Sequence, residues 1–373
     1  MKKYSNGKLL TSMGLPTITD IKSLSQQLKL SEKLVYFYTN EDADNKYDVF
    51  KIPKKDGSFR IISAPKASFK VIQRWVLENI LYRVKVSDCS YGFKKSKNGS
   101  PLVGCAERHK NNLYMLKMDI KNFYPSIKRN QIFFQFLEIG YNTYAANLLT
   151  NLCYYKNGLP QGAVTSPYLA NIVCYKLDVR IESYCNKRDI VYTRYADDLA
   201  FSSDNRDSLR KIYGMIKKII EDEGFEVNGY KTIFMTPKGH KELLGVTIND
   251  GNIKAPRQMK KLVRSMIHRS IVTGDYSIKS VVCGYVSYID SIEKGYKKKI
   301  KKYISKFYED PITLFEDVVN SYNMNKFYAD MGDMEKHDIE YFYDEQVCPV
   351  SWYYDMHCEK RKQYVNMSDK TVV

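Results

Sequence analysis

Two adjacent aspartates, Asp197 and Asp198, interrupt a stretch of the sequence that is otherwise mostly apolar. The flanking residues, 190–195 and 199–203, include Ile, Val, Tyr, Leu and Phe, which predicts two β-strands joined by a tight turn. Two carboxylates at one turn repel each other, so they destabilise the fold unless a cation binds between them. This feature predicts a hairpin that carries a cation site.

A third carboxylate, Asp119, comes near the end of another apolar run. Residues 113–120 are apolar enough to predict a buried strand. A single aspartate at a strand end is more often a turn residue or a helix cap. Three carboxylates from two strands are different, because an all-oxygen ligand set suits Mg²⁺. Two Mg²⁺ ions about 3.5–4 Å apart can activate a 3′-hydroxyl and stabilise departing pyrophosphate. Asp119, Asp197 and Asp198 are therefore the predicted catalytic residues.

Composition narrows the choice of partner. Lys and Arg number 59 against 42 Asp and Glu, which gives a formal net charge of +17 and a pI near 9.2. This excess favours a phosphate-rich partner over a small acidic substrate. No apolar run approaches the roughly 18 residues that a membrane span requires, and the start lacks the apolar stretch of a secretory signal. The eight cysteines form no Cys-x-x-Cys pair, which favours reduced thiols in a cytoplasmic protein without membrane association.

Periodic patterns along the rest of the chain predict an α+β fold with helices on one face of a sheet. Residues 47–52 and 59–63 flank Asp56-Gly57, which is typical of a β-hairpin. From Pro256 onward the pattern is helical and basic. Further helices are predicted at 20–30, 32–38, 129–139, 143–155, 166–185 and 208–222, with short strands after the last of these as far as residue 253.

Four motifs occur in an order that resembles the reverse transcriptases. They are Met118–Ile127, Leu159–Gly162 with Ser166-Pro167, Tyr195–Asp198, and Gly224-Phe225 with Asn228 and Lys231. A Tyr-x-Asp-Asp box alone arises by chance, but four ordered motifs do not. The resemblance implies an RNA-directed DNA polymerase with the right-hand arrangement of palm and fingers, followed by a helical, basic thumb and a C-terminal extension.

The resemblance also implies roles around the metal ions. Asp119 and Asp197 would bridge the two Mg²⁺ ions, Asp198 would support the second carboxylate, and Ile120 would add a backbone carbonyl ligand. Tyr124 stands where the family places an aromatic ring that leaves no room for a ribose 2′-hydroxyl. The alternative for Tyr124 is an ordinary core aromatic.

The implied nucleotide contacts are spread over three segments. Gln161 and Gly162 would approach the template–primer minor groove and the incoming base, although Gly162 could equally be a turn glycine. Lys54 and Arg60 of the basic hairpin would hold the triphosphate of a dNTP, and Lys231 would also contact the nucleotide. Charged runs such as the one at Lys54 are more often solvated surface.

Within the family, the layout is most similar to the retron reverse transcriptases. The similar segments are Leu34–Tyr38, Phe59–Pro65, Ser90–Phe93 and Cys153–Gly158. The resemblance implies that the chain copies a structured non-coding RNA, primes from a 2′-hydroxyl of that RNA, and leaves a branched RNA–DNA product (msDNA) bound to the protein. It also implies a role in anti-phage defence, with an effector protein held in check by the complex.

Two segments depart from the retron pattern, and other functions stay open. Residues 105–109 read Cys-Ala-Glu-Arg-His instead of Asn-Ala-x-x-His, and residues 243–245 read Leu-Leu-Gly instead of Val-Thr-Gly. These departures concern RNA recognition rather than polymerisation. One alternative is another bacterial defence or abortive-infection reverse transcriptase without a retron RNA. A nucleic-acid scaffold that holds an effector is the other, but clustered acids that repel phosphate count against it.

The predicted domains are 1–253 for fingers and palm, 254–308 for the thumb and 309–373 for the extension. Basic residues in the thumb recur at helical spacing opposite an apolar face, which suits a nucleic-acid backbone or a generic amphipathic helix equally well. The extension contains 14 acidic and 6 basic residues with several aromatics, which suits a protein interface with the effector or a second copy. The alternative is that it folds back on the thumb. The predicted nucleic-acid contacts of the thumb are Arg257, Lys260, Lys261, Arg264 and His268.

Overall fold

The structure is a computed structural model that describes residues 6–40, 44–54, 57–94, 100–249, 251–275 and 277–307. The described residues fall into two compact units, those within 1–94 and 111–239 and those within 95–110 and 240–373. This division follows residue 239, whereas the domain boundary at residue 253 stays a prediction. Residues 309–373, for which an acidic extension was predicted, lie outside the described residues.

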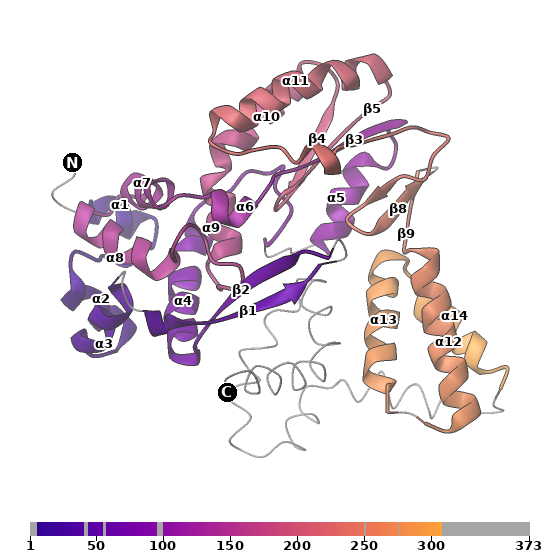
Figure 1. Ribbon diagram of the computed structural model, residues 1–373, viewed down its shortest axis with the longest axis horizontal. Helices are drawn as coiled ribbons and strands as arrows, with labels where there is room; N and C mark the ends of the chain where they lie inside the picture. Colours follow the sequence, from indigo (N-terminus) through magenta and orange to yellow (C-terminus); the bar gives the residue numbers. More distant parts are fainter. Residues whose placement is uncertain are drawn as a thin grey trace, which may run out of the picture. The chain divides into compact units, whose positions relative to one another are not determined.

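The first unit is built around a four-stranded antiparallel sheet. Its strands follow the order β4-β5-β3-β6, and helices α10 and α11 cover one face of it (Figure 1). Helix α11 buries Leu209, Ile212, Ile216 and Ile219, the periodic face that the sequence predicts for a helix on a sheet. The bounds are β3 (Tyr114–Asp119), β4 (Val191–Tyr195), β5 (Asp198–Ser203), β6 (Ile233–Met235), α10 (Tyr175–Asn186) and α11 (Arg206–Asp222).

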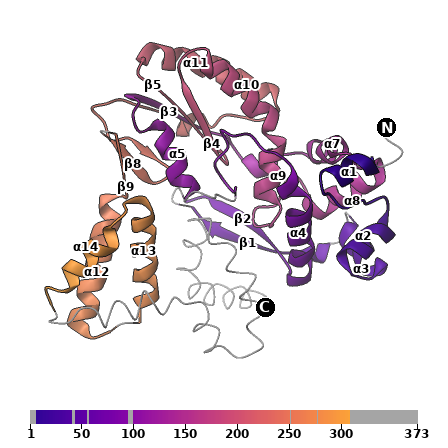
Figure 2. The same cartoon turned by 180° about the vertical axis from the view of Figure 1, so that it is seen from behind.

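A β-hairpin and a group of helices complete this unit. The predicted hairpin is present as β1 (Tyr47–Pro53) paired antiparallel with β2 (Phe59–Pro65). The small helices gather at the end of the unit beyond the hairpin (Figure 2). Ser31 caps one of them, α3, by accepting the Leu34 N–H at 3.3 Å. The helices are α1 (Gly7–Ser12), α2 (Ile21–Leu28), α3 (Glu32–Thr39), α4 (Ala67–Asn79), α7 (Arg129–Ile139) and α8 (Thr143–Cys153), with 3₁₀ turns at Asp44–Lys46, Leu81–Arg83 and Gly229–Lys231.

One predicted helix is divided in the structure. The segment predicted as a helix at 166–185 forms α9 (Ser166–Val173) and α10, with Cys174 between them. The ψ angle of Cys174 is 3°, well outside the helical range. The Asp178 N–H still donates to the Cys174 carbonyl at 2.9 Å, so the chain changes direction without losing the hydrogen bond at the break.

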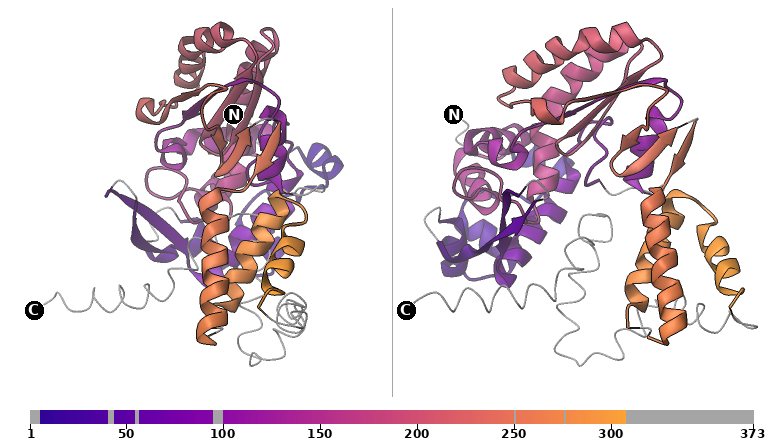
Figure 3. Two further views of the ribbon diagram at one scale, coloured as in Figure 1. Left: turned by 90° about the vertical axis from the view of Figure 1, so that its right-hand side faces the viewer. Right: turned by 45° about the vertical axis from the view of Figure 1, so that its right-hand side comes forward.

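The second unit combines a short helix, a three-stranded sheet and a bundle of helices. Helix α12 packs on α13, and α13 packs on α14 (Figure 3). Val263, Ile267, Val286, Ile289 and Ile300 are buried in this unit, so the predicted helical thumb has its own apolar core. The elements are α5 (Pro101–His109), β7 (Glu242–Leu243), β8 (Val246–Asn249), β9 (Asn252–Lys254), α12 (Arg257–Thr273), α13 (Lys279–Ile292) and α14 (Tyr296–Ile304).

Two expectations from composition can be compared with the described residues. Within them, no helix is both long and apolar enough to cross a membrane. The described cysteines are all buried, as is usual for thiols in the interior of a reduced protein; they are Cys89, Cys105, Cys153, Cys174, Cys185 and Cys283.

Candidate active site

The strand register brings the three predicted catalytic aspartates to one end of the sheet. Asp119, the last residue of β3, lies directly opposite Asp198, the first residue of β5. Asp197 stands in the turn just before β5, and its carbonyl accepts the Ile120 N–H at 2.9 Å. The hairpin predicted from the sequence is therefore present, and pairing with β3 adds the third carboxylate.

The turn that carries Asp197 has an unusual backbone conformation. Tyr195 pairs with Asp198 across the hairpin, which leaves Ala196 and Asp197 as its two central residues. Ala196 has a φ of 56°, in the left-handed region that residues with a side chain seldom adopt. Such a conformation persists where surrounding contacts fix it. The turn is therefore held by contacts that the apolar flanking pattern does not reveal.

Asp119 lies close enough to Asp197 and Asp198 for its negative charge to affect the ionisation of both. Burial raises the pKa of Asp197 to about 6, with further contributions from the charges of Asp198 and Asp119. Burial also raises the pKa of Asp198, and Lys117 opposes part of this rise. A nearby positive charge stabilises the ionised form of such buried, mutually repelling carboxylates. One cation is supplied by the chain itself, because Lys231 places its ammonium 2.9 Å from Asp119 Oδ2.

Lys231 reaches Asp119 from the segment that follows α11. The Asn228 N–H donates to the Asp119 carbonyl at 2.8 Å, and the Lys121 N–H donates to the Glu226 carbonyl at 2.8 Å. These bonds run the 226–228 segment alongside the end of β3. Although burial opposes its charge, the hydrogen bond to Asp119 and the three carboxylates raise the pKa of Lys231. Lys231, which the sequence predicts to contact the nucleotide, therefore lies in the carboxylate cluster.

The comparisons with known proteins agree with this geometry. Residues 52–248 match the family described as "Reverse transcriptase (RNA-dependent DNA polymerase)". The chain is 34% identical over 312 residues to the retron Ec86 reverse transcriptase of Escherichia coli, covering 82% of this chain and 94% of that protein. The chain belongs to the retron-type reverse transcriptases. It is accordingly an RNA-directed DNA polymerase with the palm and fingers fold, as the motifs predicted.

Two further comparisons found proteins that are similar to this reverse transcriptase. The retron Ec83 reverse transcriptase of Escherichia coli is 29% identical over 286 residues, which cover 70% of this chain and 91% of that protein. Among solved structures, apo telomerase from Candida tropicalis aligns at 15% identity with a TM-score of 0.47, covering 72% of this chain and 60% of that one.

The donor chemistry of the reverse transcriptase suits the divalent ions that such enzymes use. Asp119, Asp197 and Asp198 offer only oxygen ligands, and Ile120 could add its carbonyl. Among the described residues, however, no three His, Cys, Asp or Glu side chains already converge into a metal-binding group. Lys231 holds one oxygen of Asp119 at 2.9 Å. An ion that binds at Asp119 would therefore compete with this ammonium and draw the carboxylates together.

Removal of one carboxylate should stabilise the metal-free reverse transcriptase in a pH-dependent manner. The pKa of Asp197 is raised from 3.8 to about 6, so the folded state holds a proton that the unfolded state has already released between these pH values. Stability contributed by this group therefore falls as pH rises from about 4 to about 6. In EDTA at pH 7, Asp197→Asn should raise the free energy of unfolding by about 3 kcal/mol, which a higher melting temperature would show, and at pH 4 it should change it scarcely at all. A gain that is equal at both pH values would contradict this origin of the raised pKa.

The segment around Tyr124 packs against the Leu159–Gly162 motif. Tyr124 lies half-buried in the short helix α6 (Phe123–Ser126), and its carbonyl accepts the Leu159 N–H at 3.0 Å. A Cβ on Gly158 would lie only 2.6 Å from the Pro125 backbone. Glycine is therefore required at 158 for this contact, which holds the helix that carries Tyr124 against the motif.

The Gln161-Gly162 pair contacts the fingers hairpin. The Ser63 N–H on β2 donates to the Gln161 carbonyl at 2.7 Å. Gly162 has a φ of 115°, and a Cβ there would lie 2.9 Å from the Ser63 carbonyl oxygen. Packing against β2 thus accounts for Gly162 without any nucleic acid. The predicted triphosphate contacts, Lys54 and Arg60, are exposed on the same hairpin, outside the carboxylate cluster.

In the thumb, the structure separates Lys260 from the other predicted contacts. Arg257, Lys261, Arg264 and His268 are exposed on α12, as a backbone-binding face requires. The Lys260 ammonium instead lies 2.6 Å from Glu293, and both side chains are largely buried. Glu293 also accepts the Ala255 N–H at 2.8 Å. Lys260 therefore joins the start of α12 to the end of α13 and does not belong to the exposed face.

Sequence reasoning missed a buried polar group that lies beside the Ala196-Asp197 turn. It consists of Asn171 on α9, Asp178 on α10 and Arg194 on β4, all of them inaccessible to solvent. A faint signal was available, because Arg194 occupies an inward position of an otherwise apolar strand. A charged side chain at such a position requires a buried partner.

Proposed function

We propose that this reverse transcriptase copies a structured non-coding RNA of its own into DNA and leaves a branched RNA–DNA product, with priming from a ribose 2′-hydroxyl. The observation that supports polymerisation is the placement of Asp119 opposite Asp198, with Asp197 in the adjacent turn between β4 and β5. The similarity to retron enzymes over 82% of the chain supports the choice of template. The attacking oxygen would bond to the α-phosphorus of a dNTP, and the bond to the departing pyrophosphate would break.

Two Mg²⁺ ions are the proposed cofactors. Bound by Asp119, Asp197, Asp198 and the Ile120 carbonyl, they would lower the pKa of the attacking hydroxyl and stabilise negative charge on the leaving group. The chain itself orients the three carboxylates through the β3–β5 register. Lys231 keeps a positive charge beside Asp119, where the triphosphate would add negative charge. This arrangement supports Lys231 as a nucleotide contact.

The nucleic acid that copurifies with the protein provides the direct test of the branched product. Sequencing it before and after treatment with a 2′,5′-debranching enzyme should reveal one RNA joined to DNA through a 2′,5′ bond. Linear DNA, with no junction that responds to debranching, would favour the alternative defence reverse transcriptase. An absence of any DNA would favour the scaffold.

Tyr124→Ala should weaken the selection of deoxynucleotides over ribonucleotides. The half-buried ring of Tyr124 is held by the contact between α6 and Leu159, so it can act as a fixed wall beneath the sugar. Loss of one such contact alters discrimination by about 1–3 kcal/mol, or roughly 10–200-fold. Single-nucleotide incorporation with dGTP and GTP measures the ratio. Phe134→Ala, which removes an exposed aromatic of α7, is the matched control. If both variants have the same dGTP to GTP ratio, the residue that excludes the 2′-hydroxyl is not Tyr124.

The acidic segment 309–373 is proposed to bind the effector of an anti-phage system. Its 14 acidic and 6 basic residues repel phosphate, while its aromatics are the residue types that dominate protein interfaces. A chain ending at residue 307 should make DNA at the rate of the full chain but lose effector capture and phage protection. Loss of DNA synthesis on truncation would instead show that the segment belongs to the polymerase fold.

A further inference from the structure

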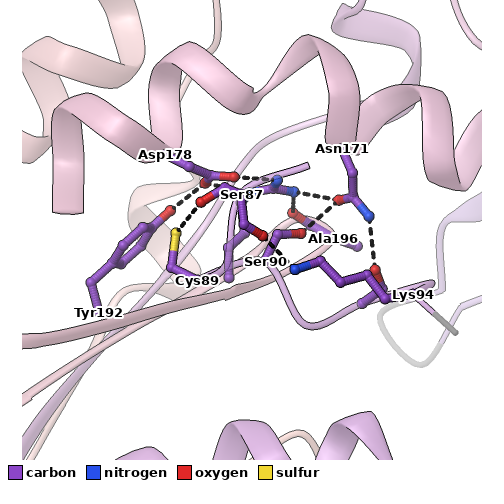
Figure 4. A network of polar contacts seen from close by, with 10 residues as sticks. Ser87, Cys89, Ser90, Lys94, Asn171, Asp178, Tyr192 and Ala196 are labelled. Atoms are coloured by element: carbon purple, nitrogen blue, oxygen red, sulfur yellow. Dashed lines mark hydrogen bonds and ion pairs between the residues drawn. The ribbon is translucent and has the colours of Figure 1, made fainter. Parts of the chain in front are cut away.

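Arg194 is the largest side chain in the described residues that is wholly buried. Its Nε and Nη2 donate to the two carboxylate oxygens of Asp178, both at 2.7 Å. The remaining nitrogen, Nη1, is directed toward the catalytic turn, where it donates to the Ala196 carbonyl at 3.2 Å and to Asn171 Oδ1 at 3.0 Å. Figure 4 labels Asp178, Asn171 and Ala196, the three residues that these hydrogen bonds join. The guanidinium thus joins a helix to the residue that precedes Asp197.

Asn171 extends the same group to the loop that precedes residue 95. Asn171 Oδ1 accepts from Ser90 Oγ at 2.9 Å, and Asn171 Nδ2 donates to the Gly92 carbonyl at 2.8 Å (Figure 4). The loop also bonds to the backbone of Arg194, which donates to the Cys89 carbonyl and accepts from the Tyr91 N–H, both at 2.8 Å. A Cβ on Gly92 would lie 3.0 Å from the Ala196 nitrogen. The loop therefore packs directly on the turn.

These contacts fix the peptide groups on both sides of Asp197. Arg194 holds the Ala196 carbonyl, which precedes Asp197, and the Ile120 N–H holds the Asp197 carbonyl, which follows it. With both peptide planes fixed, the direction of the Asp197 side chain is restricted as well. Ala196, at a φ of 56°, needs such external contacts because its own preference opposes the conformation.

We propose that Arg194 and Asn171, anchored by Asp178, are positioning residues that hold the Ala196-Asp197 turn in the conformation needed for polymerisation. This inference rests on the proposed catalytic role of Asp197. Arg194 acts through the Ala196 carbonyl and touches neither nucleotide nor primer. The competing explanation is that the buried ion pair only stabilises the contact of α10 with β4.

Arg194→Lys separates the two explanations. Lysine retains a positive charge that can face Asp178, but it lacks the planar fork that reaches the carboxylate, Asn171 and the Ala196 carbonyl together. The expected result is a fall in kcat of about 10²-fold, the effect of a displacement of about 1 Å at a reacting centre, with little change in KM for dNTP. Hydrogen exchange measured by mass spectrometry should become faster in the peptide that contains residues 195–199.

Tyr192→Phe is the matched control, because Tyr192 donates to the same Asp178 carboxylate at 2.9 Å but makes no described contact with the turn. It should lower the melting temperature while kcat and exchange at 195–199 stay at parental values. If Arg194→Lys does not fold, Asn171→Ala keeps the ion pair and should show the same faster exchange with a smaller fall in kcat.

The outcomes distinguish this inference from the catalytic assignment. Parental exchange at 195–199 in a folded Arg194→Lys enzyme would overturn the positioning role, as would equal losses of kcat in Arg194→Lys and Tyr192→Phe. Neither result bears on the catalytic role proposed for Asp197. That role is contradicted only if Asp197→Asn retains polymerase activity. Exchange is measured on the metal-free protein, so it does not depend on catalysis.

Discussion

Asp197→Asn should abolish DNA synthesis while RNA binding stays close to that of the parent enzyme. Asparagine keeps the shape of the side chain in the turn but removes the charge that a metal ion needs. Metal ions contribute several kcal/mol to such reactions, and each 1.36 kcal/mol is tenfold in rate, so the loss should be roughly 10³-fold or more. Primer extension with Mg²⁺ measures the rate, and filter binding of the copurifying RNA measures affinity.

A matched control uses another aspartate of the same unit. Asp222 pairs with Arg180 at 2.8 Å on the outer surface of α10 and α11, where an exposed ion pair contributes about 0–1 kcal/mol. Asp222→Asn should therefore extend primers at the parental rate. Primer extension by Asp197→Asn at a rate near that of Asp222→Asn would remove Asp197 from the catalytic group.

The carboxylate cluster could be predicted because its signals are local. Asp197 and Asp198 stand between two short apolar segments, and a two-residue turn is the direct consequence of that pattern. Asp119 ends a third apolar segment, so the motif order was enough to bring it to the same sheet. The exact pairing of Asp119 with Asp198 was not readable, because register depends on contacts between strands far apart in sequence.

The supporting contacts could not be predicted, because they join distant segments through polar side chains. Asn171, Asp178 and Arg194 come from three elements, and although Arg194 stands out in its strand, nothing in the sequence identifies its two partners. The same limit applies to Lys260, whose partner Glu293 lies 33 positions away. Helical spacing places Lys260 on a basic face, whereas in the structure its side chain is largely buried in an ion pair with Glu293.

The division between the two units at residue 239 could not be read from the motifs for a related reason. Residues 240–254 form β7, β8 and β9, which motif order assigns to the palm because they follow it directly. In the structure they belong with α5, a helix from residues 101–109, and with the helices of the thumb. Motifs show only the order of segments along the chain. Which unit a segment belongs to depends on the apolar surfaces against which it packs. The kink at Cys174 likewise leaves the apolar pattern of residues 166–185 intact, and this is why one helix was predicted there.

Asp178→Ala should be among the most destabilising single substitutions in the first unit. It would leave the Arg194 guanidinium buried without its carboxylate partner, and breaking a buried pair in this way costs about 3–5 kcal/mol. The arginine cannot avoid this cost by losing its proton, because a guanidinium stays protonated in proteins. Urea denaturation followed by circular dichroism should show the loss as a lower midpoint. Lys217→Ala, which removes an exposed pair with Glu221, should shift the midpoint far less.

A double substitution distinguishes the penalty of the stranded charge from the loss of packing. Asp178→Leu combined with Arg194→Met replaces both charges by apolar side chains, and such replacements of buried pairs are often neutral or stabilising. The double variant should therefore recover most of the stability that Asp178→Ala loses. It should nevertheless stay defective in DNA synthesis, because methionine cannot donate to the Ala196 carbonyl that Arg194 holds at 3.2 Å. A double variant that is both stable and fully active would mean that the pair contributes neither to folding nor to the geometry of the catalytic turn.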